Sequence, residues 1–408
     1  MWRGVILALL IAAPAAAQDR APVEAQFQTW LEEVIWPAAE ERGVSRATFE
    51  ATLGNVTLNW DLPSLAPPGF PPADTGFKQA EFRAPARYFN ADNIAASGRI
   101  GAQLAARHAA TLRALEDRFG VPGHILLAIW GRESGFGQVA IRDNPFPVLA
   151  TRGFMGANAT YFTSETLALL DIAQSGVVPL ADLRSSWAGA LGQPQMMPGS
   201  YLAYAADGNG DGRIDIWGSA DDTLASIASF LALHDWQPGR DWGFEVVLPP
   251  TLSCGLEGPD NRKPIAQWVA DGVTRPGGRA FPTHELSGDA SLMLPAGRNG
   301  PAFLVTPNFY VLKRYNPSDL YALFVGHVGD RIAYGVGDFA APWGNTDSLL
   351  RSDVARIQTA LIALGHDVGG ADGLVGYKTR RAIGRWQTAT GRDATCFPSR
   401  AILAALAP

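Results

Sequence analysis

Residues 121–137, VPGHILLAIWGRESGFG, decide how the chain folds, because they join a run of apolar residues to a single carboxylate. Pro122 suits the first turn of a helix, where its missing N–H has no intrahelical partner. Every residue from Ile125 to Trp130 is apolar, which predicts a helix buried on all sides. Gly135 and Gly137 supply the positive φ at which helices commonly end.

Glu133 falls in the last turn of this predicted helix. Its apolar neighbours and the negative end of the helix dipole both disfavour the charged carboxylate. A carboxyl group that stays neutral near pH 7 can act as a general acid. The alternative is a solvated glutamate at a helix end, which is the more common situation for this residue type. The rest of the chain decides between the two interpretations.

The composition is that of a globular protein with a substantial core. The chain has 408 residues, of which 47% are hydrophobic and 18% are charged, so two or three domains are expected. The net charge of -6 argues against a nucleic-acid partner, which requires a basic face. The 12 tryptophans and 9 tyrosines fit an ordinary core, and they also suit stacking on sugar rings.

The first residues predict export. Arg3 precedes an apolar run over residues 5–13, and Ala15 to Ala17 provide the small residues that a signal peptidase reads. The run is too short for a stable membrane anchor. No cysteine follows the cleavage site, so no lipid anchor is expected. Residues 1–17 are therefore interpreted as a cleaved signal peptide, and the mature protein as soluble, without a membrane anchor.

Hydrophobic periodicity and turn residues divide the chain into helical and irregular segments. Helical structure is expected over residues 18–60, a long amphipathic helix over 90–120, and a further helix within 149–176 with Thr163 or Ser164 as its N-cap. A proline-rich loop is expected over residues 61–77, and short strands over 244–248, 291–294 and 303–305. Further along the chain we expect a helix over 318–332, a linker over 338–348 and a compact helical module over 349–408.

The sequence DGNGDGRID predicts a calcium loop. Asp207, Asn209, Asp211 and Asp215 stand at positions one, three, five and nine of an EF-hand-like pattern, and Gly212 stands at the sixth, where the chain must turn sharply. The twelfth position is Gly218 instead of a bidentate glutamate, and Asp221 is the expected substitute. The alternative is an Asp- and Gly-rich surface turn. A calcium ion here is expected to have a structural role.

The chain has two cysteines, Cys254 and Cys396. In an oxidising compartment they could form a disulfide that ties the C-terminal module to the rest of the protein. The competing interpretation is two unrelated buried thiols, and the sequence alone does not decide between them.

Four motifs in order, GRESGFG, SWAGALGQPQMMPGSY, DGNGDGRIDIW and RYNPSDLYAL, resemble the lytic murein transglycosylase B family (glycoside hydrolase family 103) from about residue 22 to 337. Residues 350–408 resemble the peptidoglycan-binding domain type 1. The resemblance implies a mainly α (α+β) fold: a lysozyme-like core with a helical N-terminal part, a small β-containing region and a C-terminal three-helix module. It implies a catalytic domain over 18–337 with the EF-hand-like loop at 207–221, and a periplasmic protein that acts on peptidoglycan.

The resemblance also implies roles for individual residues. Glu133 falls on the single catalytic acid, and Ser186 and Gln195 fall on groups that line the sugar subsites. Tyr315 and Asn316 fall on the pair beside the scissile bond. The implied calcium ligands are Asp207, Asn209, Asp211, Arg213 through its carbonyl, and Asp221. The chain departs from the family pattern at Phe230, where a tyrosine is expected, and at Ala157-Asn158, where an arginine pair is usual.

The implied reaction needs one carboxyl group and no organic cofactor. Ordinary glycosidases use two carboxylates, whereas here Glu133 is expected to protonate the leaving oxygen and then to take a proton from the muramic acid 6-hydroxyl. The product carries a 1,6-anhydro-N-acetylmuramic acid end. The alternatives are a hydrolytic muramidase, a non-catalytic peptidoglycan-binding or scaffold protein, and a glycosidase acting on another N-acetylated polymer such as chitin.

Overall fold

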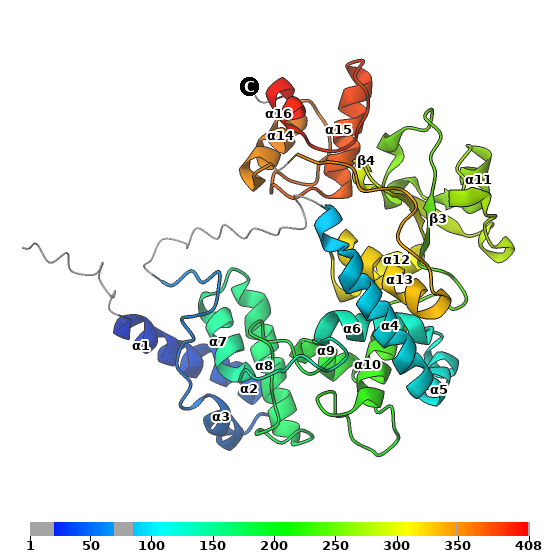
Figure 1. Cartoon of the computed structure of the whole chain (residues 1–408). Helices are drawn as coiled ribbons and strands as arrows, with labels where there is room; N and C mark the ends of the chain where they lie inside the picture. Colours follow the sequence, from blue (N-terminus) through cyan, green and yellow to red (C-terminus); the bar gives the residue numbers. More distant parts are fainter. Residues whose placement is uncertain (1–19, 69–84, 348, 407–408) are drawn as a thin grey trace, which may run out of the picture. The chain divides into compact units, whose positions relative to one another are not determined.

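The computed structural model describes residues 20–68, 85–347 and 349–406, which form two compact units (Figure 1). The first unit contains residues 20–68, 141–191 and 196–202, and the second contains 85–140, 192–195 and the rest of the described chain from 203 onward. The predicted signal peptide and the second half of the predicted proline-rich loop lie outside the described residues. Among the helices that are described, none combines the length and the apolarity needed to cross a bilayer.

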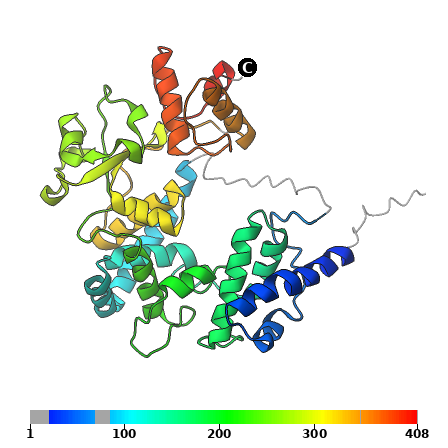
Figure 2. The ribbon, with the colours of Figure 1, turned by 180° about the vertical axis from the view of Figure 1, so that it is seen from behind.

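The first unit is helical. Its elements are α1 (Ala21–Trp30), the π-helical turn η1 (Leu31–Ile35), α2 (Trp36–Glu41), α3 (Arg46–Leu53), α7 (Pro145–Met155), α8 (Ala159–Ser175) and the first part of α9 (Pro198–Tyr204). In both Figure 1 and Figure 2, α7 and α8 run side by side, and α2 and α3 pack against α8. The helical N-terminal part is confirmed, but it is broken into several pieces.

One break has a local cause in the sequence. The N–H of Trp36 donates to the carbonyl of Leu31, five residues back, instead of four. Pro37 follows directly, and a proline has no N–H and crowds the carbonyl four residues before it, which here belongs to Glu33. Within this turn Leu31 and Ile35 are buried, whereas Val34 is 47% exposed.

Two further predictions about helices need correction. The segment 90–120 forms two helices, α4 (Ala91–Arg107) and α5 (Ala109–Phe119), because His108 leaves the helical conformation with φ -100 and ψ 22. The predicted N-caps Thr163 and Ser164 lie inside α8, whose N-cap is Asn158. The hydroxyls of both residues instead donate to carbonyls of Gly153 and Tyr161.

The second unit places α6 (Gly123–Ser134) among α4, α10 (Ala220–Ala232) and α13 (Asp319–Tyr334), with α12 (Pro307–Tyr315) beside α13. The 3-10 turn η3 (Pro85–Tyr88) packs on α13. A close approach of α4 to α13 depends on Gly101, because a Cβ at this position would lie 2.3 Å from Cδ1 of Ile332. The predicted buried helix, α6, is thus the central member of this helical core.

A small antiparallel sheet extends this core, with the strand order β1-β5-β3-β2. Its strands are β1 (Gly243–Val246), β2 (Lys263–Pro264), β3 (Asp289–Met293) and β5 (Ala302–Val305), with β4 (Pro295–Arg298) and α11 (Ile265–Ala270) nearby. Leu304 pairs with both Phe244 and Leu292, and all four residues of β5 are buried, as expected for a central strand. The three predicted strands are confirmed, and β2 and β4 were missed.

The C-terminal module, residues 349–406, contains α14 (Arg351–Ala363), α15 (Tyr377–Ala389) and α16 (Arg400–Leu406) around an apolar core. The amide of Gln358 holds the loop between α14 and α15, accepting from Gly373 N at 2.7 Å and donating to Leu374 O at 2.9 Å. The segment predicted as a linker is packed: Trp343 stacks on Phe89 with ring centroids 5.0 Å apart. The predicted mainly helical fold with a small β-region is confirmed.

Candidate active site

Glu133 is the second-last residue of α6. Pro122 is the N-cap, one residue before the helix instead of inside its first turn, and Gly135 ends the helix in the left-handed region with φ 58. All residues from Ile125 to Trp130 are buried, as predicted. The carboxyl group of Glu133 is therefore held at the end of a helix that is packed on all sides.

A phenol from another helix meets this carboxyl. Tyr321, on the first turn of α13, donates from its hydroxyl to Oε1 of Glu133 at 2.5 Å, and only 1% of its surface is exposed. Ser318 caps α13 by accepting from Tyr321 N, which fixes the turn that carries the phenol. Tyr321 was not among the predicted site residues, although it lies in the RYNPSDLYAL motif, six residues after Tyr315.

The ionisation of Glu133 is shifted as a catalytic acid requires. Burial raises the pKa of Glu133, against the hydrogen bond from Tyr321 and the charge of Arg132, which both lower it. Burial and the nearby Glu133 also raise the pKa values of Tyr315 and Tyr321 well above the ordinary value of 10.0. Both phenols therefore stay protonated, and each uses its proton in a hydrogen bond, Tyr321 to the Glu133 carboxyl and Tyr315 to Pro194 O. Within the described residues, no carboxylate is among the groups that act on Glu133.

Residues 192–195 form hydrogen bonds with the elements around Glu133. Gln193 accepts from Trp130 Nε1 at 2.8 Å and donates to Trp217 O at 2.7 Å, so it links α6 to the loop before α10. Tyr315 donates to Pro194 O at 2.7 Å. Gln195 has φ 53, an uncommon conformation for a residue with a side chain, and its amide donates to Gly192 O. Gln195 was among the predicted site residues, and Gln193 was not.

Asn316 and Phe230 flank Tyr315. Asn316 ends α12 and accepts from Ser318 N at 3.1 Å, so its amide stabilises the turn into α13. Phe230 lies edge-on to Tyr315 with centroids 4.8 Å apart and stacks on His234 at 4.1 Å. The ring at position 230 therefore supports the Tyr315 ring through packing, a contact that does not need the hydroxyl expected from the family pattern.

Ser186 belongs to the first unit, where it begins a tight turn. Its N–H donates to Ala190 O at 2.9 Å, and its carbonyl accepts from Gly189 N at 2.8 Å. The next residue, Trp187, is 52% exposed and carries Arg152 over its ring. The role of Ser186 as a sugar-contacting residue stays a prediction.

The predicted calcium loop is folded by its own side chains. Asp207 accepts from Gly210 N at 2.6 Å through Oδ1 and from Gly212 N at 2.8 Å through Oδ2. Asn209 and Asp211 each accept from the backbone two residues on, Asp211 from Arg213 N. Asp222, fully buried, was missed by sequence analysis. It accepts from Gly208 N at 2.9 Å and Asp215 N at 2.8 Å, and so closes the loop.

The loop residues fit a hard cation in chemistry. Two carboxylates, an amide oxygen and the Arg213 carbonyl are donors that Ca²⁺ prefers. Oδ1 of Asp221 is buried and has no hydrogen-bond partner, while His108 Nδ1 lies 3.4 Å away. Asp215 turns to the backbone of Trp217 and Gly218 instead. Across the described residues, no three His, Cys, Asp or Glu side chains are grouped closely enough to hold a metal by themselves.

Cys254 and Cys396 are joined by a disulfide with an S–S distance of 2.12 Å, which answers the question that the sequence left open. Cys254 lies in the 3-10 turn η4 (Cys254–Leu256) and Cys396 follows α15, so the bond links the C-terminal module to the region of the small sheet. Beside it, Arg380 of α15 forms an ion pair with Glu257, and the two side chains are 3% and 0% exposed.

A half-buried carboxyl with a raised pKa, held at the end of a central helix beside phenols, has the properties of a general acid. Within the described residues, no second carboxylate acts on it. The mainly helical body that carries it has the lysozyme-like fold of the transglycosylases. The family model for the transglycosylase SLT domain matches residues 26–330, most of the chain, and the protein belongs to this family. A second model, for a peptidoglycan binding domain, matches residues 351–406.

Individual relatives agree with this assignment. The structure of SltB3 from Pseudomonas aeruginosa in complex with NAG-anhNAM-pentapeptide is 35% identical, covers 94% of this chain and 99% of that chain, and has a TM-score of 0.80. The Escherichia coli lytic transglycosylase Slt35 in complex with calcium is 26% identical over 78% of this chain and 95% of that chain, with a TM-score of 0.58.

The membrane-bound lytic murein transglycosylase B of Escherichia coli K12 is 32% identical over 217 residues. That stretch is 53% of this chain and 58% of the relative, so the match spans little more than half of either protein.

Proposed function

We propose that the protein is a lytic transglycosylase that cleaves the β-1,4 bond between N-acetylmuramic acid and N-acetylglucosamine in peptidoglycan. The observation that carries this proposal is the Glu133 carboxyl, whose pKa burial raises and whose Oε1 is already hydrogen-bonded by Tyr321. The relatives support the substrate, since SltB3 was solved with fragments that contain a NAG–NAM or a NAG–anhNAM unit and a pentapeptide.

In the first step, Glu133 gives its proton to the glycosidic oxygen as the bond from that oxygen to C1 of the muramic acid breaks. The carbonyl of the sugar's own N-acetyl group stabilises the positive charge on C1. The ionised Glu133 then takes the proton of the 6-hydroxyl as O6 bonds to C1. The 1,6-anhydro end forms, no water is consumed, and Glu133 is again protonated. A pKa near the working pH serves both proton transfers.

The surrounding residues have complementary parts in this proposal. Because Tyr321 occupies Oε1, the transferable proton resides on Oε2, which fixes the direction of transfer. Tyr315 and Asn316, held by Pro194 and Ser318, position the sugar ring and its acetamido group. Gln195 and Ser186 contribute polar contacts to the glycan. The Gln195 amide nitrogen already donates to Gly192, so its oxygen is the atom that a ligand N–H would meet.

The proposal also includes a calcium site and a cellular location. Asp207, Asn209, Asp211, the Arg213 carbonyl and Asp221 would hold Ca²⁺, which would stiffen the loop before α10 and supply no chemistry to Glu133. The calcium complex of Slt35 supports this assignment. We place the protein in the periplasm, with residues 1–17 as signal peptide, 18–337 as catalytic domain, 338–348 as connecting segment and 349–408 as peptidoglycan-binding module.

The test is digestion of purified sacculi by the wild-type protein and by Glu133→Gln, with mass spectrometry of the released fragments. We expect anhydro ends, one water lighter than hydrolytic products, and a loss of rate of at least a hundredfold in Glu133→Gln, the lower range for losing an acid–base catalyst. Fragments with reducing ends only would identify a hydrolytic muramidase. Binding to sacculi without any release, unchanged by Glu133→Gln, would identify a binding or scaffold protein.

A further inference from the structure

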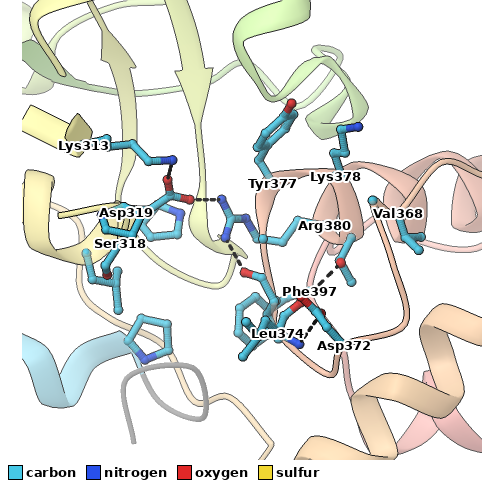
Figure 3. Close-up of a pocket in the computed structure, with 18 of the residues that line it drawn as sticks. Lys313, Ser318, Asp319, Val368, Asp372, Leu374, Tyr377, Lys378, Arg380 and Phe397 are labelled. Atoms are coloured by element: carbon cyan, nitrogen blue, oxygen red, sulfur yellow. Dashed lines mark hydrogen bonds and ion pairs between the residues drawn. The ribbon is translucent and has the colours of Figure 1, made fainter. Parts of the chain in front are cut away.

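A cavity of about 620 Å³ lies in the second unit between the C-terminal module and the helices that carry the active-site phenols (Figure 3). The module contributes two loop segments and the start of α15, and the other wall comes from η3, α6, α12 and α13. The principal lining residues are Arg132, Lys313, Asn316, Leu374, Tyr377 and Arg380. The cavity is thus built from both segments that match family models.

Three lining residues are direct chain neighbours of the site around Glu133. Arg132 precedes Glu133, Asn316 follows Tyr315, and Leu320 precedes Tyr321. Consecutive Cα atoms are about 3.8 Å apart, so the cavity wall and the site around Glu133 adjoin along the backbone at three points. A group attached to a sugar bound at Glu133 is therefore within reach of this space.

The two walls are joined by ion pairs, of which Arg380–Glu257 is buried and those of Asp319 are partly buried. Arg380 donates to Glu257 at 2.6 Å. It also donates to Asp319 at 3.1 Å, and Lys313 binds the other oxygen of Asp319 at 2.7 Å (Figure 3). The Cys254–Cys396 disulfide ties the same module to the sheet region. A cavity whose two walls are joined by an ion cluster and a covalent bond keeps its shape, which lowers the entropic cost of binding a ligand.

The lining favours a peptide with a free carboxylate over a sugar. Arg132 donates to the Tyr88 hydroxyl at 2.8 Å. Within the described residues it forms no ion pair with a carboxylate, so its guanidinium can pair with a carboxylate of a ligand. The two tyrosines of the lining already carry a guanidinium over one face, Arg132 over Tyr88 and Arg381 over Tyr377. Sugar recognition uses open aromatic faces, whereas proline, leucine and valine surfaces such as these suit an extended peptide.

We propose that this cavity binds the peptide stem carried by the muramic acid of peptidoglycan, and that Arg132 forms an ion pair with a carboxylate of the stem. The inference rests on the proposed function and adds a site for the peptide to the site for the glycan. The C-terminal module then binds the peptide stem, while residues on α6 and α13 act on the sugar.

Two glycines allow the cavity to be filled without disturbing the fold. Both glycines line the cavity, a Cβ at either position meets no atom within 4 Å, and neither residue has a positive φ, so Gly370→Trp and Gly376→Trp each add a bulky ring at the cavity wall. Gly337, which has the same open surroundings and does not line the cavity, provides the matched control Gly337→Trp. Arg132→Gln removes the proposed ion pair, and Arg132→Lys keeps a positive charge.

The experiment measures binding of each variant, in the inactive Glu133→Gln background, to glycan strands with intact stems and to strands stripped of stems by an amidase. We expect Glu133→Gln alone to bind stem-bearing strands at least fivefold more tightly than stripped strands. Gly370→Trp, Gly376→Trp and Arg132→Gln should remove this difference and leave stripped-strand binding unchanged, while Gly337→Trp and Arg132→Lys should preserve it.

The proposal is overturned if Glu133→Gln binds both kinds of strand equally, or if the filled-cavity variants lose affinity for both kinds alike or for neither. Activity of the wild-type protein on sacculi is measured separately. A wild-type protein that releases no anhydro fragments and yet shows the stem-dependent binding would contradict the proposed function and retain the peptide site.

Discussion

The hydroxyl of Tyr321 lies 2.5 Å from Oε1 of Glu133, and this contact joins the first turn of α13 to the last turn of α6. The hydrogen bond opposes burial, because it favours the ionised carboxyl whereas burial favours the neutral one. The balance suits a group that must give a proton and then accept one. Tyr321 is therefore assigned a part in setting the acidity of Glu133 as well as its orientation.

Removing the phenol should shift the pH dependence in a defined direction. Tyr321→Phe removes an interaction that lowers the pKa of Glu133, so that pKa should rise further. The protonated acid then persists to higher pH, and the alkaline limb of the kcat/KM profile should move upward. Loss of a hydrogen bond to a charged group costs about 1.5–3 kcal/mol, so kcat should fall by about tenfold or more.

The matched control is Tyr334→Phe, on the same helix and 67% exposed, which should leave the profile unchanged. An alkaline limb that stays in place, or moves to lower pH, in Tyr321→Phe would show that the phenol does not control the acidity of Glu133.

The helix that carries Glu133 was predictable because its signals are local: a proline before it, apolar residues throughout and glycines after it. Tyr321 was not, since 188 residues separate it from Glu133 and nothing near either residue reports the contact. The break at His108 escaped for a related reason, because the apolar spacing continues through α4 and α5 while the backbone does not. Gln193 lies two positions before the predicted Gln195, and Asp222 lies one position after the predicted Asp221. Which of two such neighbours makes the contact depends on the direction of the backbone, which the sequence does not show.

Arg380 should be a principal stabiliser of the contact between the C-terminal module and the rest of the second unit. Arg380→Met leaves Glu257 buried without its cation, which typically costs about 3–5 kcal/mol. Arg380 and Lys313 also hold the pKa of Asp319 below its ordinary value despite burial. A carboxyl with a lowered pKa stabilises the fold above its unfolded pKa of 3.8, and this contribution disappears as the pH falls through the folded value.

Urea unfolding at pH 7 with the disulfide intact tests this contribution. The control is Asp260→Asn, which removes the partner of the neighbouring Arg381, and Asp260 is 57% exposed. Exposed pairs contribute about 1 kcal/mol or less, so Asp260→Asn should shift the unfolding midpoint little. Equal shifts in the two variants would refute a special role for the buried pair.

Calcium should stabilise the protein through the loop that begins at Asp207. A ligand that binds only the folded state at about 100 times its Kd contributes about 2.7 kcal/mol, so the melting temperature should rise when CaCl₂ replaces EGTA. Asp207→Asn and Asp211→Asn should remove this rise. Asp393→Asn, which makes the same charge change at an exposed position outside the loop, should retain it. A wild-type melting temperature that is insensitive to Ca²⁺ would remove the metal from the proposal.

Asp330 should make the fold less stable as the pH rises. Burial raises the pKa of this carboxyl from 3.8 to about 7, although it accepts a hydrogen bond from Trp242 Nε1 at 3.2 Å. Below pH 3.8 the carboxyl is protonated in both the folded and the unfolded state, and its contribution is fully present. Between the two pKa values only the unfolded state ionises, so stability falls by roughly 1.4 kcal/mol per pH unit.

Asp330→Asn keeps an oxygen for Trp242 and cannot ionise. Its melting temperature relative to the wild-type protein should therefore be unchanged near pH 4, rise through neutrality and level off above pH 7. Asp117→Asn on α5, at an exposed position, makes the same charge change without the burial and should show no such trend. A constant difference between Asp330→Asn and the wild-type protein across this range would mean that Asp330 ionises as easily in the folded state as in the unfolded one.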